Sequence, residues 1–383
     1  MSRIRTTRSL AAVACLLALL TAATSQINAA NVEIPDPSLR SAVKAELGIA
    51  DTLNVTDEDM ERLIELKSNI EGIEQLGGLE AAVNLETLAL SNPSISDLSA
   101  LDGLPRLKTL GLFGNQANSL TMTPGLENLT ALDLRSSATE TLTFSVPMPK
   151  LRSLDLANTP IVDYSFLREL PGLEHLDISS NGLADVSFLA GLHSLRTLNL
   201  EFNSLSTLTF PSGLDSLTTL ELRYNQLTHL ELPAGMEQLT ILDITGTGGS
   251  GHNDLRELIL PNDLSNLTEI LLQGNKLASL RLPVGTTRLT KLNIGDNQLR
   301  TVEVPVGFHL DDLEVIGYPK RRFSFYVPLS IRPESDGVEI SWTQGTLQSK
   351  NGLSDPWSDL TDARSPYMLR TTDLSGFFRV RPE

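Results

Sequence analysis

Acidic residues recur at a fixed spacing through the middle of the chain. The sequence numbers of Asp133, Asp155, Asp177, Glu221 and Asp243 differ by multiples of 22. Carboxylates that a fold brings within about 5 Å of each other repel, so a row of them favours a cation or a basic partner. The spacing therefore indicates binding chemistry on one surface, provided that the fold itself repeats with the same period.

Aromatic residues, arginines and a histidine accompany this acidic row. Exposed aromatic residues and arginines are enriched at the energetic hot spots of protein interfaces. Two pairs, Glu201–Phe202 and Arg223–Tyr224, stand one period apart and are expected to form one patch. The candidate partner-binding residues are Phe113, Arg135, Asp155, His175, Asp177, Glu201, Phe202, Glu221, Arg223 and Tyr224. The alternative is that these side chains form a scattered, solvated face.

Residue types that serve in catalysis or metal binding are present, but not in productive patterns. None of the five histidines is paired with another at metal-ligand spacing, and no zinc motif appears. Neither a glycine-rich phosphate loop nor a serine elbow is found. The sequence therefore predicts no catalytic residue, no metal site and no cofactor, in a protein that is not an enzyme.

A leucine pattern supplies the repeat that the acidic row requires. Each repeat, which would form one coil of the fold, begins with a pattern close to L-x-x-L-x-L-x-x-N. The segment "LTTLELRYN" shows this pattern clearly. The first leucines, spaced by 22 except for one step of 28 and one of 24, are Leu85, Leu107, Leu129, Leu151, Leu173, Leu195, Leu217, Leu239, Leu267, Leu289 and Leu313. This is the signature of a leucine-rich repeat solenoid, whose stacked coils bury one another's leucines.

The fold class follows from the spacing within each coil. L-x-L has period two, so it forms a short strand with its leucines facing inward. Amides at the ninth position are expected to bond backbone groups inside the coil; they belong to Asn115, Asn181, Asn203, Asn225, Asn275 and Asn297. Looser turns are expected where Pro93, Ser137, Thr159 and Thr247 replace asparagine. We predict an α/β, strand-rich leucine-rich repeat solenoid with a parallel sheet on its concave face.

The second half of each coil comes in two forms. "ISDLSALDGLPRL", "IVDYSFLRELPGL" and "LADVSFLAGLHSL" are typical of short helical turns. Three other segments alternate before Pro211, Pro233 or Pro283, which predicts a short second strand on the convex side. The step of 28 residues, from Leu239 to Leu267, arises from an insertion within 245–254. A tolerated surface loop is expected there, and a ligand contact through His252 or Asp254 is the alternative.

The first 29 residues differ from the rest of the chain. Three arginines precede an apolar run that closes in small residues, which is typical of a secretory signal peptide. A retained membrane anchor is the alternative. Cleavage after Ala29 would remove the only cysteine and leave 27 basic residues against 47 acidic ones, a net charge of −20. That charge argues against nucleic acid and against an anionic membrane surface as partners. We expect a secreted, extracellular or cell-envelope protein with no membrane span in the mature chain.

The coils resemble the internalin-type leucine-rich repeats of bacterial surface proteins over about residues 33–318, most clearly in "LEHLDISSNGLADVSFLAGL". The segment "EIPDPSLRSAVKAELGI", followed by "LNVTDEDMERLIEL", resembles the helical cap that opens many such arrays. A degenerate first coil is expected to start at Leu63, because it lies one period before Leu85. The predicted organisation is a signal peptide at 1–29, a helical N-terminal cap at 30–62, the solenoid at 63–319 and a β-rich C-terminal module at 320–383.

This resemblance implies protein or glycan binding at a cell surface. The first hypothesis is a protein partner, which the acidic row allows to be basic, bound on the concave face. The second is a glycan- or envelope-binding adhesin that is attached through residues 320–383. Trp342 and Trp357 would then stack on sugars; the alternative is that Trp342, Trp357 and Phe378 are core residues or seal the last coil.

Overall fold

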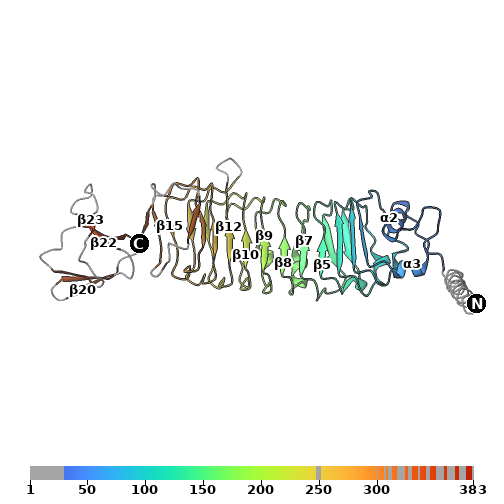
Figure 1. Ribbon diagram of the computed structural model, residues 1–383, viewed down its shortest axis with the longest axis horizontal. Helices are drawn as coiled ribbons and strands as arrows, with labels where there is room; N and C mark the ends of the chain where they lie inside the picture. Colours follow the sequence, from blue (N-terminus) through green and yellow to red (C-terminus); the bar gives the residue numbers. More distant parts are fainter. Residues whose placement is uncertain are drawn as a thin grey trace, which may run out of the picture. The chain divides into compact units, whose positions relative to one another are not determined.

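The structure is a computed structural model that describes residues 30–246 and 252–299, followed by shorter segments. These segments are 301–305, 308, 313–316, 324–326, 330–334, 337–341, 346–350, 358–359, 367–370 and 377–381. The chain divides into two compact units, Met1–Leu151 and Arg152–Glu383, and each is described by itself (Figure 1). The predicted signal peptide at 1–29, Thr247 and both tryptophans lie outside the described residues.

Two short helices open the described part of the first unit. Helix α2 spans Pro37–Leu47, with Asp36 as its N-cap and Gly48, at φ 67°, as its C-cap. Its buried residues are Leu39, Ala42 and Val43, which is the apolar stripe expected of a helix that covers a core. Helix α3 spans Asp57–Glu61 and begins with a capping box between Thr56 and Asp59.

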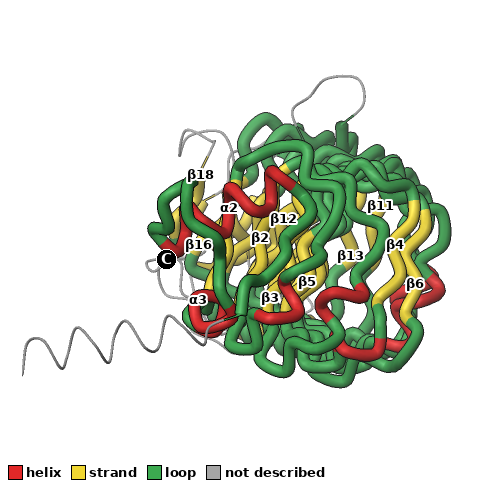
Figure 2. Tube along the Cα trace, turned by 90° about the vertical axis from the view of Figure 1, so that its right-hand side faces the viewer, coloured by secondary structure: helices red, strands yellow, loops and turns green. Residues whose placement is uncertain are grey.

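A parallel sheet follows these helices in the first unit. Its strands are β1 (Glu65–Ser68), β2 (Thr87–Ser91), β3 (Thr109–Phe113) and β5 (Ala131–Asp133). Leu66, Leu88, Leu110 and Leu132 pair in register and are buried, so the predicted degenerate coil that starts at Leu63 is confirmed. A second parallel pair, β4 (Ser119–Met122) and β6 (Thr141–Phe144), lies across the coil from β3 and β5 (Figure 2).

The second unit carries the same main strand in coil after coil. These strands are β7 (Ser153–Asp155), β8 (His175–Asp177), β9 (Thr197–Asn199), β10 (Thr219–Glu221), β12 (Ile241–Asp243), β14 (Glu269–Leu271), β16 (Lys291–Asn293) and β18 (Glu314–Ile316). Consecutive strands pair in parallel, with the central leucine of each facing that of the next, as for Leu198 and Leu220. Both are at most 1% exposed. The predicted parallel-strand solenoid is therefore confirmed.

Short 3-10 helices form the back of several coils. They are η1 (Leu79–Ala81), η2 (Ser99–Leu101) and η3 (Pro124–Leu126) in the first unit, and η4 (Ser165–Glu169) and η5 (Ser187–Leu189) in the second. The helical turns predicted within residues 95–107, 161–173 and 183–195 are thus present, as η2, η4 and η5. The carboxylate of Asp163 accepts bonds from the backbone N (2.8 Å) and the Oγ (2.9 Å) of Ser165 at the start of η4.

Second strands form the back of other coils in the second unit: β11 (His229–Glu231), β13 (Glu257–Ile259), β15 (Leu280–Arg281), β17 (Thr301–Glu303) and β19 (Ser324–Tyr326). The strands predicted before Pro233 and Pro283 are present. The strand predicted before Pro211 is wrong, because residues 205–210 form no regular strand. The coil before them turns through η5, so a strand here would have an extended neighbour, β11, on one side only.

The last described strands change from parallel to antiparallel pairing. Strands β20 (Ser330–Glu334), β21 (Gly337–Ser341) and β24 (Tyr367–Arg370) form one sheet. Strands β23 (Ser358–Asp359), β22 (Thr346–Lys350) and β25 (Phe377–Arg381) form another. The domain boundaries at 30, 63 and 320 stay predictions.

Asparagines at the ninth position bond backbone groups, as predicted, and their partners include carbonyls of the preceding coil as well as of their own. Asn225 donates through Nδ2 to the Leu200 carbonyl (2.8 Å) and accepts at Oδ1 from the Leu205 amide (3.1 Å). In the coil with the insertion, Asn253 makes the same contacts, donating to the Leu222 carbonyl at 2.8 Å. Asn253 is fully buried. The prediction that Thr247 takes the ninth position of that coil is therefore wrong, because the insertion displaces the position to Asn253.

Candidate functional site

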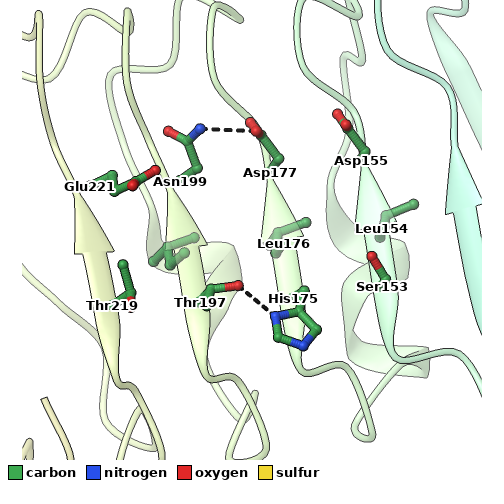
Figure 3. Close-up of a pocket in the computed structure, with 11 residues that line it drawn as sticks. Ser153, Leu154, Asp155, His175, Leu176, Asp177, Thr197, Asn199, Thr219 and Glu221 are labelled. Atoms are coloured by element: carbon green, nitrogen blue, oxygen red, sulfur yellow. Dashed lines mark hydrogen bonds between the residues drawn. The ribbon is translucent and has the colours of Figure 1, made fainter. Parts of the chain in front are cut away.

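A hollow of about 270 Å³ lies on the outward side of strands β7, β8, β9 and β10 (Figure 3). We call the outward side of these strands and of β12 the strand face. The hollow is lined by four of the predicted candidates, Asp155, His175, Asp177 and Glu221, together with serine, threonine and asparagine side chains. The structure therefore brings these four residues together.

Most acidic side chains of the row stabilise a turn within their own coil. The Oδ1 atom of Asp177 accepts a bond from the Ser179 amide two positions later, at 2.9 Å. The same bond recurs at the other short acidic or amide side chains of the row, namely Asp133, Asp155, Asn199, Asp243 and Asn293. Such a bond rigidifies the turn after each strand. The repeating aspartates are therefore explained mainly by the turn that they stabilise.

Glu221 is the exception in this row. Its longer side chain accepts no such bond, and within the described part of the chain no ion pair or side-chain hydrogen bond to it is found. Burial raises its pKa, and repulsion from Glu201 raises it further, against the opposing effect of Arg223. Figure 3 shows the Glu221 side chain on the same side of the sheet as Asp177 and Asp155. Glu221 is thus a half-buried carboxylate without a contact partner among the described residues.

The other polar side chains in the hollow bond to one another. Asn199 Nδ2 donates to Asp177 Oδ2 at 2.9 Å, so both oxygens of Asp177 already accept hydrogen bonds. His175 Nδ1 lies 2.7 Å from Thr197 Oγ1 at the opposite end of the two strands (Figure 3). These contacts hold the side chains of neighbouring coils in fixed positions, so the hollow has a defined shape.

Arg223 is engaged by carboxylates of the neighbouring coils. Its Nε donates to Glu201 in a close ion pair and lies 3.5 Å from Asp243 Oδ2. Glu201 is 8% exposed and Asp243 is 6% exposed. Burial works against the charge of Arg223, but the hydrogen bond to Glu201 and the nearby carboxylates raise its pKa. The arginine therefore neutralises buried acids, a contact that the spacing of the sequence does not reveal.

Phe202 and Tyr224 form a stacked pair on adjacent coils, with ring centroids 4.3 Å apart and an angle of 14° between the rings. We call these two residues the aromatic pair. The rings of Tyr224 and His252 pack edge to face, with their centroids 5.2 Å apart and an angle of 68° between the rings. The Nδ1 atom of His252 is buried and has no hydrogen-bond partner among the described residues. Phe202 remains 52% exposed, so the pair presents open apolar surface.

The aromatic pair occupies a backbone position that disfavours large side chains. The eighth residue of a coil has a left-handed φ at Asn92, Gly114, Ser136, Asn158, Ser180, Phe202, Tyr224, Gly274 and Asp296. Glycine, asparagine and aspartate tolerate this conformation, whereas a bulky side chain there is an outlier. Phe202 and Tyr224, at φ 53° and 54°, therefore carry a strain of about 1–2 kcal/mol each that glycine, asparagine or aspartate would reduce.

The remaining two candidates, Phe113 and Arg135, lie in the first unit. The Cζ atom of Arg135 sits 4.8 Å from the centroid of the Phe113 ring. Its Nη2 is 3.1 Å from Asp133 Oδ2. This is a cation–π contact supported by an ion pair. Phe113 is therefore already covered by an arginine of its own chain.

Among the described residues, no group of three or more histidine, cysteine or acidic side chains is placed to hold a metal ion. No described helix has the length and apolarity needed to cross a membrane.

Residues 149–191 and 171–214 match the family described as Leucine Rich repeats (2 copies). The strands, turns and buried asparagines of these residues continue into the other coils of each unit. The chain is a leucine-rich repeat protein. No protein of curated function matches it significantly in sequence.

Solved structures of bacterial proteins are similar to this leucine-rich repeat protein. An internalin (InlF) of Listeria monocytogenes is 23% identical, with 76% of this chain and 98% of that chain covered and a TM-score of 0.46. A leucine-rich repeat protein of Leptospira interrogans is 20% identical, with 71% of this chain and 88% of that one covered and a TM-score of 0.49. The functional domain of InlJ from Listeria monocytogenes is 16% identical, with 82% of this chain and 95% of that chain covered and a TM-score of 0.37.

Proposed function

We propose that this chain is a secreted or surface-displayed binding protein that holds a protein partner on its strand face. The aromatic pair carries the proposal. Two large rings are kept at backbone positions that strain them, and one of them is half exposed. Packing of the repeat does not require either ring, because Ser180 and Asn158 serve at the same position.

The surroundings of the aromatic pair fit a protein interface. Hot spots in such interfaces combine a central aromatic anchor with polar groups at the rim. Phe202 supplies the anchor, and the hollow beside strands β7 to β10 supplies polar groups with defined positions. The proposal is of binding without catalysis. Secretion rests on the predicted signal peptide at 1–29.

The partner is to be captured by chemical cross-linking to the full chain and then mapped by hydrogen exchange. We expect protection of the amides in 197–204 and 219–226, where the strand face meets the aromatic pair. The control for substitutions in the aromatic pair is Val284→Thr. Val284 is an apolar residue that is 66% exposed and follows strand β15, away from the aromatic pair in sequence. This variant should leave the affinity unchanged. Protection confined to residues outside β7–β12 would contradict the proposal.

A chain without residues 320–383 separates this function from the adhesin. Retention of the protein partner by the shortened chain supports binding at the strand face. Polysaccharide binding that is lost with residues 320–383 would favour the adhesin instead.

A further inference from the structure

The eighth residues of successive coils in the second unit form a regular row. The backbone N atoms of Asn158, Ser180 and Phe202 each donate to the carbonyl of the seventh residue of the next coil, at 2.8, 2.9 and 3.0 Å. The three residues share a left-handed φ of 51°, 60° and 53°. Because the backbone conformation and its bonds both repeat, the three side chains leave their coils in the same direction.

One face of the Phe202 ring is open. Tyr224 covers the opposite face, because the two rings stack with their centroids 4.3 Å apart and an angle of 14° between them. Tyr224 belongs to the following coil, so the open face turns toward Ser180 in the preceding coil. A serine side chain is too short to cover a phenyl ring, and Phe202 is 52% exposed. We call the space over Ser180, between Phe202 and Asn158, the ring slot.

The width of the ring slot matches one flat ring. Neighbouring strands of a sheet lie about 4.8 Å apart, so the two coils from Asn158 to Phe202 span about 10 Å. A flat ring between two walls needs about 7–8 Å, because carbon atoms in contact are about 3.5–4.0 Å apart. Phe202 and Tyr224 show that rings on consecutive coils can stack at this spacing. The slot therefore has room for one more ring in the same orientation.

The charges around the ring slot favour an uncharged ring over a cation. Glu201, which precedes Phe202 in the chain, is already in an ion pair. Glu221 belongs to the same coil as Tyr224, on the covered side of the Phe202 ring. In the preceding coil, both oxygens of Asp177 accept hydrogen bonds. A cation in the slot would have the ring as its main partner, whereas an aromatic side chain buries apolar area and also stacks.

We propose that the ring slot takes an aromatic side chain of the protein partner, which stacks on the open face of Phe202. The row of rings would then extend by one coil, with one ring from the partner and two from the aromatic pair. This inference rests on the proposed function and names the group of the partner that meets the aromatic pair.

The first test uses the full chain and three synthetic peptides that differ at one residue within a glycine–serine sequence. That residue is tyrosine, arginine, or cyclohexylalanine, which is apolar but neither flat nor aromatic. Binding is measured by nuclear magnetic resonance, from the shifts of the Ser180 and Phe202 amides as peptide is added. We expect the tyrosine peptide to bind about threefold to tenfold more tightly than either of the others, because stacking adds to the gain from buried area. Phe202→Asn should abolish this preference.

The second test fills the ring slot from within the chain. Ser180→Tyr places a ring over the open face of Phe202, so it should weaken binding of the tyrosine peptide at least about tenfold. Ser136→Tyr is the matched control, because Ser136 is an exposed serine at the eighth position of a coil in the first unit, with a φ of 59°. This control should leave the affinity unchanged.

Urea titrations of the same two variants test the slot without any partner. Both substitutions place a tyrosine at a left-handed φ and introduce similar strain. The new ring stacks on Phe202 in Ser180→Tyr alone, so this variant should unfold at a higher urea concentration than Ser136→Tyr.

The outcomes separate this inference from the proposed function. Equal affinity for the tyrosine and cyclohexylalanine peptides, tighter binding of the arginine peptide, or no shift of the Ser180 and Phe202 amides would overturn the aromatic occupant. Equal unfolding of Ser180→Tyr and Ser136→Tyr would overturn the slot itself. If the captured partner still loses affinity with Phe202→Asn, the proposed function stands and the partner meets the aromatic pair through another group. A partner that is indifferent to Phe202→Asn would overturn both.

Discussion

The rings of Phe202 and Tyr224 lie face to face, 4.3 Å apart, on consecutive coils whose backbone is left-handed at both residues. The one stacking contact contributes about 0.5–1.5 kcal/mol, which does not exceed the combined strain of about 2–4 kcal/mol from two left-handed residues. The pair therefore adds little net stability to the fold. The 52% exposure of Phe202 connects the pair with binding instead.

The buried asparagines should dominate the stability of individual coils. Asn225→Ala removes the bonds to the Leu200 carbonyl and the Leu205 amide from a fully buried site. Because each unsatisfied backbone group costs about 1–3 kcal/mol, we expect the free energy of unfolding to fall by about 2–4 kcal/mol in urea titrations. Asn158→Gly is the control, since Asn158 is exposed and has a left-handed φ of 51°. Equal unfolding curves for the two variants would refute this role.

Asp36 should link the first helix to the coil that follows it. Its carboxylate accepts bonds from the amides of Leu39 (2.9 Å), Glu74 (2.7 Å) and Gln75 (3.2 Å). Burial acts to raise its pKa, but these bonds outweigh burial and lower it. Asp36→Ala should therefore destabilise the protein by about 2–3 kcal/mol at pH 7.

The pH dependence of this effect has a definite sign. Because the folded state lowers the pKa of Asp36, its stabilisation is present above the unfolded value of 3.8 and is lost as the pH falls through the folded value. The difference between wild type and Asp36→Ala should shrink as the pH is lowered below 3.8. Asp51→Ala, at an exposed carboxylate near the same helix, should show no such difference. A pH-independent effect of Asp36→Ala would exclude the carboxylate as its origin.

The ionisation of Glu221 should lower the stability of the protein, whereas that of Asp36 raises it. Burial, followed by repulsion from Glu201, raises its pKa in the folded protein above the reference value of 4.5. The folded state then favours the protonated form, so stability is greatest below pH 4.5 and falls as the pH rises through the folded pKa. Glu221→Gln should remove this loss, and its stability relative to wild type should be higher at pH 7 than at pH 4. Denaturant titrations at the two pH values measure the change, and a relative stability that is lower at pH 7 would contradict the assignment.

The strands and asparagines were predictable because each is set by contacts at a fixed spacing of one coil. The leucines of L-x-L, such as Leu220, must face inward, and the amide of Asn225 must satisfy the turn beside it. The expected strand before Pro211 is absent because strand formation depends on the neighbouring coil, where η5 turns the chain. The sequence predicts Thr247 at the ninth position, which Asn253 occupies. Counting along the sequence cannot show whether the inserted residues come before or after that position.

The site was predictable in its members but not in their contacts. The regular spacing identifies the acidic row, yet it does not show that Asp177 stabilises its own turn or that Arg223 is shared between two acids. Side-chain length offers one signal, because Glu221 stands where most coils of the middle of the chain carry aspartate or asparagine. The sequence also signals that Phe202 and Tyr224 are unusual at their position, because the equivalent residues of the other coils are small or polar.

The central claim is that the aromatic pair anchors a protein partner. It is tested most directly by the affinity of the captured partner for the full chain carrying Phe202→Asn and Tyr224→Asn together. Asparagine tolerates the left-handed backbone, so the free energy of unfolding should fall by no more than about 1 kcal/mol. Loss of a true anchor costs about 2 kcal/mol or more, so the dissociation constant should rise at least about thirtyfold. A stable double variant that binds the partner as tightly as the wild type would contradict the account.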